Sequence, residues 1–191
     1  SAAKLAGADA VKFQSFKTEE FMSNTKIIYT YGKNKTKENM FKMFKRLEFK
    51  NYWYKLLKNF CKKKKIDFLT SVADIDNLKR YLSINPKIIK LASEDLINFK
   101  LLKAVSKTNK YIILSTGMAD DDEIKSALKH FKNKKKLVLL HCVSLYPTEN
   151  KLTNLMRINS LKEKYKVKVG YSDHTIGINA CIFASALGAK V

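Results

Sequence analysis

Short apolar runs alternate with stretches of helical spacing along most of this chain. The runs are rich in Val and Ile, and they occupy residues 9–14, 66–71, 87–93, 111–116, 136–142 and 166–172. Several are apolar nearly throughout, which is typical of strands covered on both faces. Between them, apolar residues recur at spacings of three and four, as in Ile124, Ala127, Leu128 and Phe131. Strands that alternate with helices predict βαβ units and a parallel sheet, and therefore the α/β class.

The region from Thr18 to Lys65 follows a different pattern. It predicts a short helix near residues 18–22, a polar Asn/Lys/Thr loop, and a long aromatic-rich helix from about 37 to 62. The apolar side chains of this helix are expected to pack in the core rather than to stack on bases: Phe41, Phe44, Trp53, Tyr54, Leu57 and Phe60. No repeat or linker marks a second domain, so we predict one domain over residues 1–191.

Both ends of the chain read as interrupted elements. The opening "SAAKLAGADA" resembles the last turn of a helix that runs into a strand, and the closing "LGAKV" resembles a helix end before another strand. We therefore expect at least one strand before Ser1 and part of one after Val191.

A net charge of +21 raises the possibility of a nucleic-acid partner. Arginine, which base-reading sites favour, occurs only at positions 46, 80 and 157, so a general solvated lysine surface is the preferred interpretation. Cys61, Cys142 and Cys181 lie far apart without a CxxC spacing, which favours reduced thiols. The sequence shows no signal-peptide pattern and no apolar run of about 18 residues, and we expect a cytoplasmic protein.

Polar side chains gather where the predicted strands end. Along the chain these residues are Lys12 and Gln14, Thr70 and Ser71, Lys90 and Ser93, Ser115 and Thr116, His141, Ser144 and Tyr146, and Ser172, Asp173 and His174. In parallel α/β folds, ligands bind outside the carboxyl ends of the strands. Any one of these residues could instead be a cap or a turn, but their repetition over six strand ends favours a binding site.

The two strand lysines indicate the charge of the ligand. Lys12 and Gln14 share one face of their strand by period-two geometry. Lys90 lies inside the apolar run Ile88–Ala92, where it faces an interior and needs a partner, because an unpaired buried ammonium is costly. Two ammonium groups with hydroxyl donors suit a small, strongly anionic guest such as a phosphate or a carboxylate.

The histidines at two of these strand ends differ in kind. His141 follows Leu139 and Leu140, and a hydrogen-bonded core histidine is the preferred interpretation. His174 follows Asp173 in a strand-end loop, where it could bind a divalent metal or belong to a structural turn. Asp173 could support such a ligand or only cap the helix after Gly177.

Several segments together resemble the sialic acid synthase family, which includes the N-acetylneuraminate, legionaminate and pseudaminate synthases. They are, in order, "GADAVKFQSFK", "IIKLASEDLINFKLL", "ILSTGMADDDEI", "LLHCVSLYPT", "NLMRI" and "VGYSDHTIGINACIFASALGA". The likeness covers nearly the whole chain and is loose only over residues 23–65.

The resemblance implies a (β/α)8 TIM barrel, here without its first strand and with its eighth strand cut. It implies an enzyme that condenses phosphoenolpyruvate with an N-acetylated amino-sugar aldehyde and releases phosphate. A divalent metal, Mn²⁺ or Mg²⁺, is implied as cofactor. A homodimer is also implied, in which an antifreeze-like C-terminal domain, absent from this chain, closes the partner's barrel.

The resemblance also assigns roles by motif. Lys12 in "VKFQ", with Lys90 and Ser93 in "KLAS", would hold the carboxylate and phosphate of phosphoenolpyruvate. Ser71, Ser115 and Ser172 would add hydroxyl donors. Gln14 and Tyr146 would face the sugar, with Ser144 beside them where many relatives carry Asn. His174 in "SDHT" would be a metal ligand.

Departures from the family pattern keep other interpretations open. A first-strand carboxylate and a second metal-binding histidine fall outside this chain, so a non-catalytic truncated barrel is one alternative. A cationic nucleic-acid-binding module is another. A third is a related phosphoenolpyruvate-using barrel of the kind that makes deoxy-octulosonate phosphate, against which "SDHT" and "YPT" argue.

Overall fold

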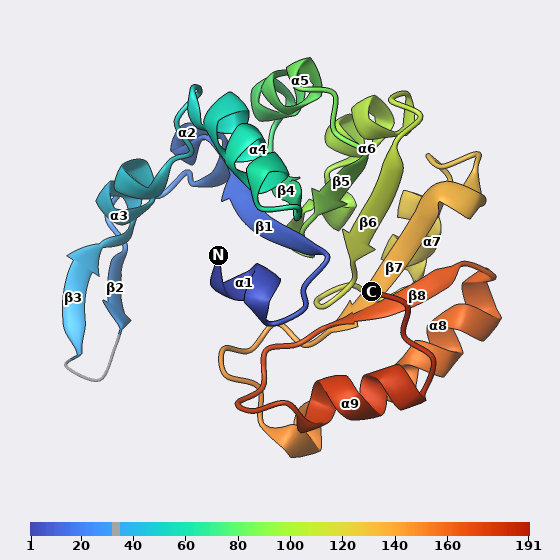
Figure 1. The fold of residues 1–191 in the computed structure, drawn as a ribbon. Helices are drawn as coiled ribbons and strands as arrows, with labels where there is room; N and C mark the ends of the chain where they lie inside the picture. Colours follow the sequence, from blue (N-terminus) through green and yellow to red (C-terminus); the bar gives the residue numbers. More distant parts are fainter. Residues whose placement is uncertain (32–34) are drawn as a thin grey trace. The chain divides into compact units, whose positions relative to one another are not determined.

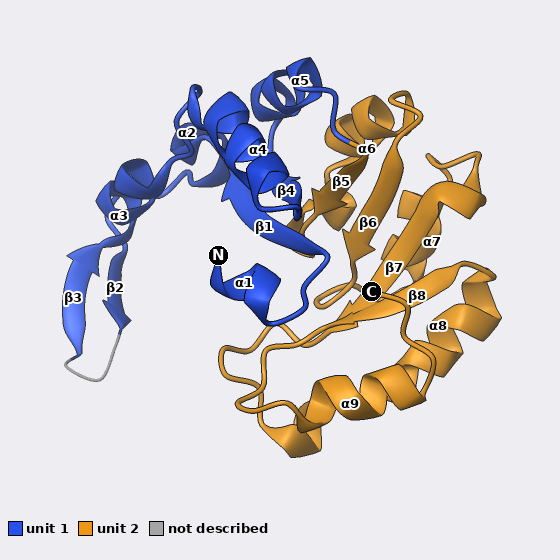
Figure 2. Cartoon of the chain, viewed as in Figure 1, with its two compact units in different colours: residues 1–86 blue, residues 87–191 orange. Residues whose placement is uncertain are grey.

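The computed structural model describes residues 1–31 and 35–191, which divide into two compact units (Figure 2). Unit 1 spans Ser1–Pro86 and unit 2 spans Lys87–Val191. Strands and helices alternate through unit 2, as the apolar pattern predicts, whereas unit 1 also contains a hairpin followed by two consecutive helices. No helix in the described part of the chain has the length and apolar character needed to cross a membrane.

Unit 1 contains a parallel pair of strands, a hairpin and several helices (Figure 1). Its elements are α1 (Ala2–Leu5), β1 (Ala10–Ser15), α2 (Thr18–Phe21), β2 (Ile28–Tyr31), β3 (Thr36–Asn39), α3 (Met40–Leu47), α4 (Trp53–Lys63), β4 (Asp67–Val72) and α5 (Ile75–Ser83). Strands β1 and β4 are parallel, with Gln14 opposite Ser71. The predicted short helix near 18–22 is confirmed as α2.

The long helix predicted from 37 to 62 is wrong, because the chain bends between α3 and α4. Phe49, in the bend, is buried against the rings of Phe13, Trp53, Tyr54 and Phe68. This packing pulls the backbone out of a continuous helix.

The predicted core of this region is confirmed at Tyr54, which is 2% exposed. Phe41, Phe44, Trp53 and Leu57 are only half-buried. Phe60 is 49% exposed, so the prediction is wrong there.

The polar loop predicted before this helix is instead a β-hairpin. Strands β2 and β3 pair antiparallel, and the hydroxyl of Tyr31 donates to Glu38 across them. The hairpin extends away from the rest of unit 1 (Figure 1). The part of the predicted loop at positions 32–34 lies outside the described residues.

Unit 2 contains a parallel sheet in the order β5-β6-β7-β8. Its elements are β5 (Ile88–Leu91), η1 (Glu94–Ile97), α6 (Phe99–Ser106), β6 (Tyr111–Ser115), α7 (Asp121–Leu128), η2 (Lys134–Lys136), β7 (Leu137–Cys142), η3 (Asn150–Leu152), α8 (Arg157–Tyr165), β8 (Lys168–Ser172) and α9 (Asn179–Ala186). Helix α8 packs against β7 and β8.

The core of unit 2 consists of strand residues and the inner faces of the helices. Ile89, Leu114 and Leu139 are fully buried on neighbouring strands, and Ile124 and Ile158 bury the faces of α7 and α8. Because the strands are parallel and in register, their carboxyl ends lie at one edge of the sheet. That edge carries the polar residues predicted from the sequence.

Candidate functional site

A buried lysine forms the centre of the candidate site in unit 2. Lys90 lies in β5 with 6% of its surface exposed. Its Nζ donates to the Ser115 hydroxyl at the end of β6, at 2.6 Å, and to the carbonyl of Leu91 at 2.6 Å. The prediction that Lys90 faces an interior and has a partner is confirmed. A buried ammonium is a strong attractor for an anion.

Ser93, Gly117, Cys142 and Ser144 converge beside this lysine at the carboxyl ends of β5, β6 and β7. The Gly117 N–H donates to Ser93 Oγ at 3.0 Å, and Ser93 Oγ lies 3.3 Å from Cys142 Sγ. A Cβ on Gly117 would lie 2.6 Å from Cys142 Sγ, 2.7 Å from Ser144 Oγ and 3.0 Å from Ser93 Oγ. Any larger residue would therefore force these side chains to shift, and the glycine lets the backbone closely approach the serine hydroxyls.

His174 and Tyr146 form a second group at the ends of β7 and β8. Their rings lie 4.2 Å apart, and Tyr146 is 77% exposed. His174 Nδ1 donates to the carbonyl of Val143 at 2.6 Å. This bond fixes the ring and leaves Nε2 as the nitrogen with a free lone pair in the neutral form, the arrangement found in metal-ligating histidines.

Asp173 ties the strand-end loop to its surroundings. Its carboxylate accepts hydrogen bonds from the Thr175 N–H at 2.9 Å, from Cys181 in α9 at 3.2 Å and from the Tyr171 hydroxyl at 3.3 Å. Burial acts to raise the pKa of Asp173, but these bonds outweigh it and hold the pKa below its usual value. Of the two roles open to Asp173 in the sequence, the structure therefore favours a structural one, in which Asp173 positions the loop that carries Ser172 and His174.

The neighbours of Asp173 are shifted in the opposite direction. Burial, followed by the adjacent carboxylate, raises the pKa of Tyr171 to about 12. The same two causes raise the pKa of the Cys181 thiol to about 11. Both groups therefore stay protonated near neutral pH and act as hydrogen-bond donors to Asp173.

His141 is a core residue, as the sequence predicts. It is 3% exposed, and its Nε2 lies 2.7 Å from the carbonyl of Thr153. Burial lowers its pKa. Because β7 alternates its faces, His141 points away from Cys142, which belongs to the Ser93 group.

Unit 1 carries the remaining predicted residues. Lys12 and Gln14 are exposed on one face of β1, and Gln14 lies opposite Ser71 of β4. Ser71 is 5% exposed, and its buried Oγ has no hydrogen-bond partner within residues 1–31 and 35–191. A buried hydroxyl with unused bonding capacity fits a contact to a ligand.

Ser172 ends β8 as a half-buried residue, directly before Asp173. Among the described residues, no three His, Cys, Asp or Glu side chains come together to hold a metal ion. The geometry of His174 fits a metal ligand. The described His, Cys, Asp and Glu side chains do not supply two more ligands beside it, so a metal there would need other ligands. Cys61, Cys142 and Cys181 are free thiols.

The sequence indicates a close backbone approach at Gly117, but sequence reasoning missed Cys142 as a member of the site and Ser93 as the partner of the Gly117 N–H. The available signal was the alternation of β7, which places Cys142 and His141 on opposite faces. The Val143 carbonyl that orients His174 carries no sequence signal, because any residue supplies one.

Comparison with known proteins adds the family context. The sequence profile described as "NeuB family" matches residues 1–191. An N,N'-diacetyllegionaminic acid synthase of Campylobacter jejuni is 39% identical over 97% of this chain and 57% of its own length. An uncharacterised protein of Methanocaldococcus jannaschii is 40% identical over 99% of this chain and 53% of its own length.

A solved structure gives the same picture at the level of fold. The N-acetylneuraminic acid (sialic acid) synthetase of Leptospira borgpetersenii, crystallised with citrate, matches with a TM-score of 0.86 and 38% identity. The match covers 98% of this chain and 62% of that one. The predicted fold class, α/β of the TIM-barrel type, is confirmed. The chain spans about half the length of the curated relatives it matches.

Proposed function

This chain belongs to the NeuB family, and from that premise we propose that the protein carrying it is a nonulosonate synthase. It condenses phosphoenolpyruvate with an N-acetylated amino-sugar aldehyde, such as N-acetylmannosamine or a relative, and releases phosphate. The proposal is supported by the names of its relatives, which include legionaminic and sialic acid synthases.

The observation that carries the proposal is the buried Lys90–Ser115 pair beside Ser93 and Gly117. Phosphoenolpyruvate is a small, multiply charged anion, and this group presents an ammonium, hydroxyls and a backbone N–H at one strand edge. Fixed donors in a site with little water stabilise charge without reorganising during the reaction. Because Ser93 Oγ accepts from Gly117, its own proton is available to Cys142 or to the ligand.

In the proposed reaction, carbon 3 of phosphoenolpyruvate attacks the aldehyde carbon, water adds at carbon 2, and phosphate leaves. Lys90 neutralises and positions the anion, and Ser93, Ser115 and Ser172 orient it through hydrogen bonds. Tyr146 and Ser144 contact the sugar. In unit 1, Lys12 and Ser71 are proposed contacts of phosphoenolpyruvate, and Gln14 of the sugar.

We include a divalent cation, Mn²⁺ or Mg²⁺, held through His174 Nε2. Such an ion supplies Lewis acidity at the aldehyde oxygen. We also propose that the full-length protein is a cytoplasmic homodimer, as its resemblance to the synthases implies.

The activity is tested on the full-length protein with phosphoenolpyruvate and N-acetylmannosamine, together with its 2,4-diacetamido relatives. Phosphate release that requires the aldehyde, and a product with the summed mass of phosphoenolpyruvate, aldehyde and one water less phosphate, are the expected results. The proposal would be contradicted if phosphate were released equally with and without the aldehyde. It would also be contradicted if no carbon–carbon bond formed with any of these sugars.

The metal role of His174 has a separate readout. We expect His174→Gln to weaken Mn²⁺ binding at least tenfold, measured by the loss of the free-ion electron paramagnetic resonance signal. The tenfold threshold is roughly the lower end of what altering a metal site's supporting residues costs, so a direct ligand should exceed it. His130→Gln, at a half-buried histidine whose ring stacks on Phe99, is the matched control. Equal Mn²⁺ affinity in the two variants would contradict the assignment.

A further inference from the structure

A pocket of unit 2 lies at the opposite end of its strands from the candidate site. Its volume is about 510 Å³. Its lining is Lys134, Lys135, Lys162, Lys166, Lys168 and Lys190, with Val167, Val169 and Gly188. We call these six lysines and the cavity between them the lysine pocket. Lys168 begins β8, whereas Ser172 ends it, so the strand's length separates this pocket from the polar edge.

The ammonium groups of the lysine pocket are unpaired. No Asp or Glu belongs to the lining, and none of the six lysines has an ion pair or a side-chain hydrogen bond within the described ranges 1–31 and 35–191. Some lysines elsewhere in unit 2 have partners, such as Lys125, which pairs with Asp122, and Lys151, which pairs with Glu149. The lining therefore concentrates positive charge that the protein itself does not neutralise.

Helix α8 shows the contrast within one element. Lys164 forms an ion pair with Asp121. Lys162 of α8 and Lys166, which follows its last residue, line the lysine pocket instead. Like charges around one cavity repel one another. The helix C-terminus offsets part of this repulsion for these two residues, but it does not explain the lysines that come from η2, β8 and the end of the chain.

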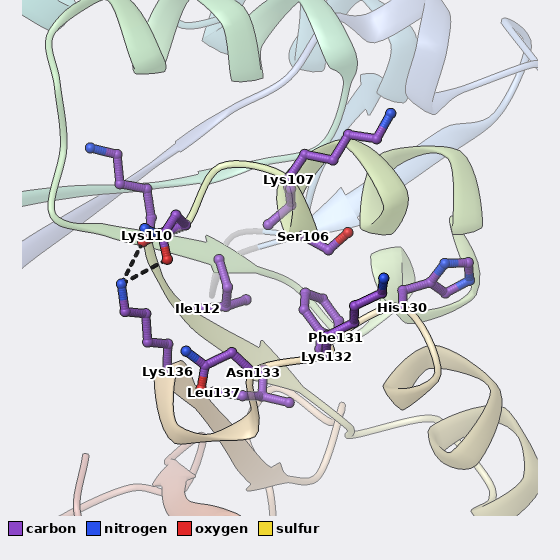
Figure 3. Close-up of a pocket in the computed structure, with 12 residues that line it drawn as sticks. Ser106, Lys107, Lys110, Ile112, His130, Phe131, Lys132, Asn133, Lys136 and Leu137 are labelled. Atoms are coloured by element: carbon purple, nitrogen blue, oxygen red, sulfur yellow. Dashed lines mark hydrogen bonds between the residues drawn. The ribbon is translucent and has the colours of Figure 1, made fainter.

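Another pocket of unit 2 contains a lysine that is held by fixed bonds (Figure 3). There Lys136 donates to the carbonyl and to the side-chain oxygen of Asn109, at 3.0 and 2.8 Å. Its ammonium also lies 5.8 Å from the centre of the Tyr111 ring. The fixed bonds of Lys136 leave it less available to a ligand than the six lysines of the lysine pocket.

We propose that the lysine pocket binds a ligand that carries several linked phosphate groups. Six flexible cations around one cavity exceed what a single phosphate can contact, and a chain of phosphates can reach several of them at once. The lining contains neither arginine nor an aromatic ring, so it offers no fork or stacking surface for a base. Recognition would rest on the phosphates alone. This site goes beyond the proposed function, because its ligand is not a substrate of the synthase.

Isothermal titration calorimetry of the full-length protein with inorganic tripolyphosphate tests the proposal. The site variant replaces Lys162, Lys166 and Lys168 by Gln, and the control variant replaces the exposed lysines Lys100, Lys103 and Lys129 by Gln. Both lose three positive charges from unit 2. We expect the site variant to bind at least about tenfold more weakly, since charge-assisted contacts are among the strong ones, and the control to stay within about twofold of the parent.

Three outcomes would overturn the proposal. Equal weakening in both variants would mean that general charge attracts the ligand. Loss of binding in saturating phosphoenolpyruvate would place the ligand at the polar edge instead. Orthophosphate binding as tightly as tripolyphosphate would remove the need for linked phosphates.

A nucleic acid is distinguished in the same experiment. We expect a 20-nucleotide RNA to bind the site variant and the control variant with equal affinity. If the site variant loses RNA binding and keeps tripolyphosphate binding, the ligand is a nucleic acid and the proposal fails. In either case, binding must weaken as salt rises, because counterions are released when phosphates meet lysines.

Discussion

At the scale of single residues, the informative feature is what each polar side chain is bonded to. Lys90 donates to the Ser115 hydroxyl and to the Leu91 carbonyl, and His174 donates through Nδ1 to the Val143 carbonyl, which leaves its Nε2 for a ligand. His141, in contrast, is buried against a backbone carbonyl, and Asp173 is occupied by its own loop. Residue type alone does not separate these cases, since two are strand-end histidines.

We expect Lys90→Met to weaken phosphoenolpyruvate binding at least tenfold. A hydrogen bond that involves a charged group is worth about 1.5–3 kcal/mol, and the change also leaves the buried Ser115 hydroxyl without its partner. Calorimetric titration of the full-length protein measures the effect. Lys103→Met, at an exposed position of α6, is the control. Affinity equal to that of the control in a folded Lys90 variant would rule out the role.

Gly117→Ala tests whether the close approach at the end of β6 matters. The new Cβ would lie 2.6 Å from Cys142 Sγ, so the side chains around the proposed anion site must shift. We expect a higher KM for phosphoenolpyruvate and a Tm lowered by about 2–4 °C, which corresponds to about 1 kcal/mol for a chain of this size.

Adding Cys142→Ala to Gly117→Ala removes Sγ, the atom nearest to the new Cβ, and should recover part of the lost Tm. The effects of substitutions at contacting residues on stability are not additive. If the two changes add independently, the steric explanation is wrong.

The part of the site that sequence could predict was the set of polar residues at the strand ends. It followed from period-two alternation and from the common edge of parallel strands. The sequence could not show that Cys142 belongs to the set or that Gly117 approaches Ser93, because these contacts arise across three different strands.

At the scale of elements, the apolar pattern predicts a strand or helix correctly where burial follows the spacing of apolar residues. It fails where contacts with distant residues decide the local structure. The six predicted strands appear within a few residues of their expected bounds, because each is a continuous apolar run between helices. The helix break near Phe49 depends on rings from β1 and β4, and the chain near residue 49 does not encode it. Strands β2 and β3 are short and mostly exposed, so their sequence has no alternation of apolar and polar residues that would predict a strand.

Asp121 joins α7 to α8 and makes stability depend on pH. It accepts from Lys164 and, at 2.9 Å, from the Tyr165 hydroxyl. These hydrogen bonds, led by that of Lys164, hold the pKa of Asp121 below its usual value. A carboxylate with a lowered folded-state pKa stabilises the fold above its unfolded pKa of about 3.9, and the contribution is lost as pH falls through the folded value.

We therefore expect Asp121→Asn to lower the free energy of unfolding by about 1 kcal/mol at pH 7, the upper end for exposed ion pairs. The difference from the parent should shrink as the pH falls below about 4, where the parent carboxylate also becomes neutral. Urea unfolding at a series of pH values measures it. Glu163→Gln, an exposed residue of α8, should have a much smaller effect. A cost that does not change with pH would mean that packing, not charge, links the helices.

At the scale of the whole molecule, charge is far from balanced. The chain has 38 Lys and Arg residues against 17 Asp and Glu, so even complete pairing of every carboxylate leaves a net charge of +21. Family membership spans residues 1–191 and accounts for the polar strand ends, but it does not account for this excess. The observed ion pairs are largely exposed, such as Lys45 with Glu19, and each contributes little.

Two effects of salt therefore oppose one another, and their sizes decide the outcome. Salt weakens exposed ion pairs, but it also screens the repulsion among the unpaired lysines, which far outnumber the pairs. We expect Tm to rise by about 2–4 °C between 20 and 300 mM NaCl, which is about 1 kcal/mol for a chain of this size.

Differential scanning calorimetry of the full-length protein and of the variant with Gln at Lys100, Lys103 and Lys129 measures this rise in Tm. The variant, with three fewer charges, should start from a higher Tm at low salt and gain less from added salt. A Tm that falls with salt in both proteins would mean that the ion pairs outweigh the repulsion.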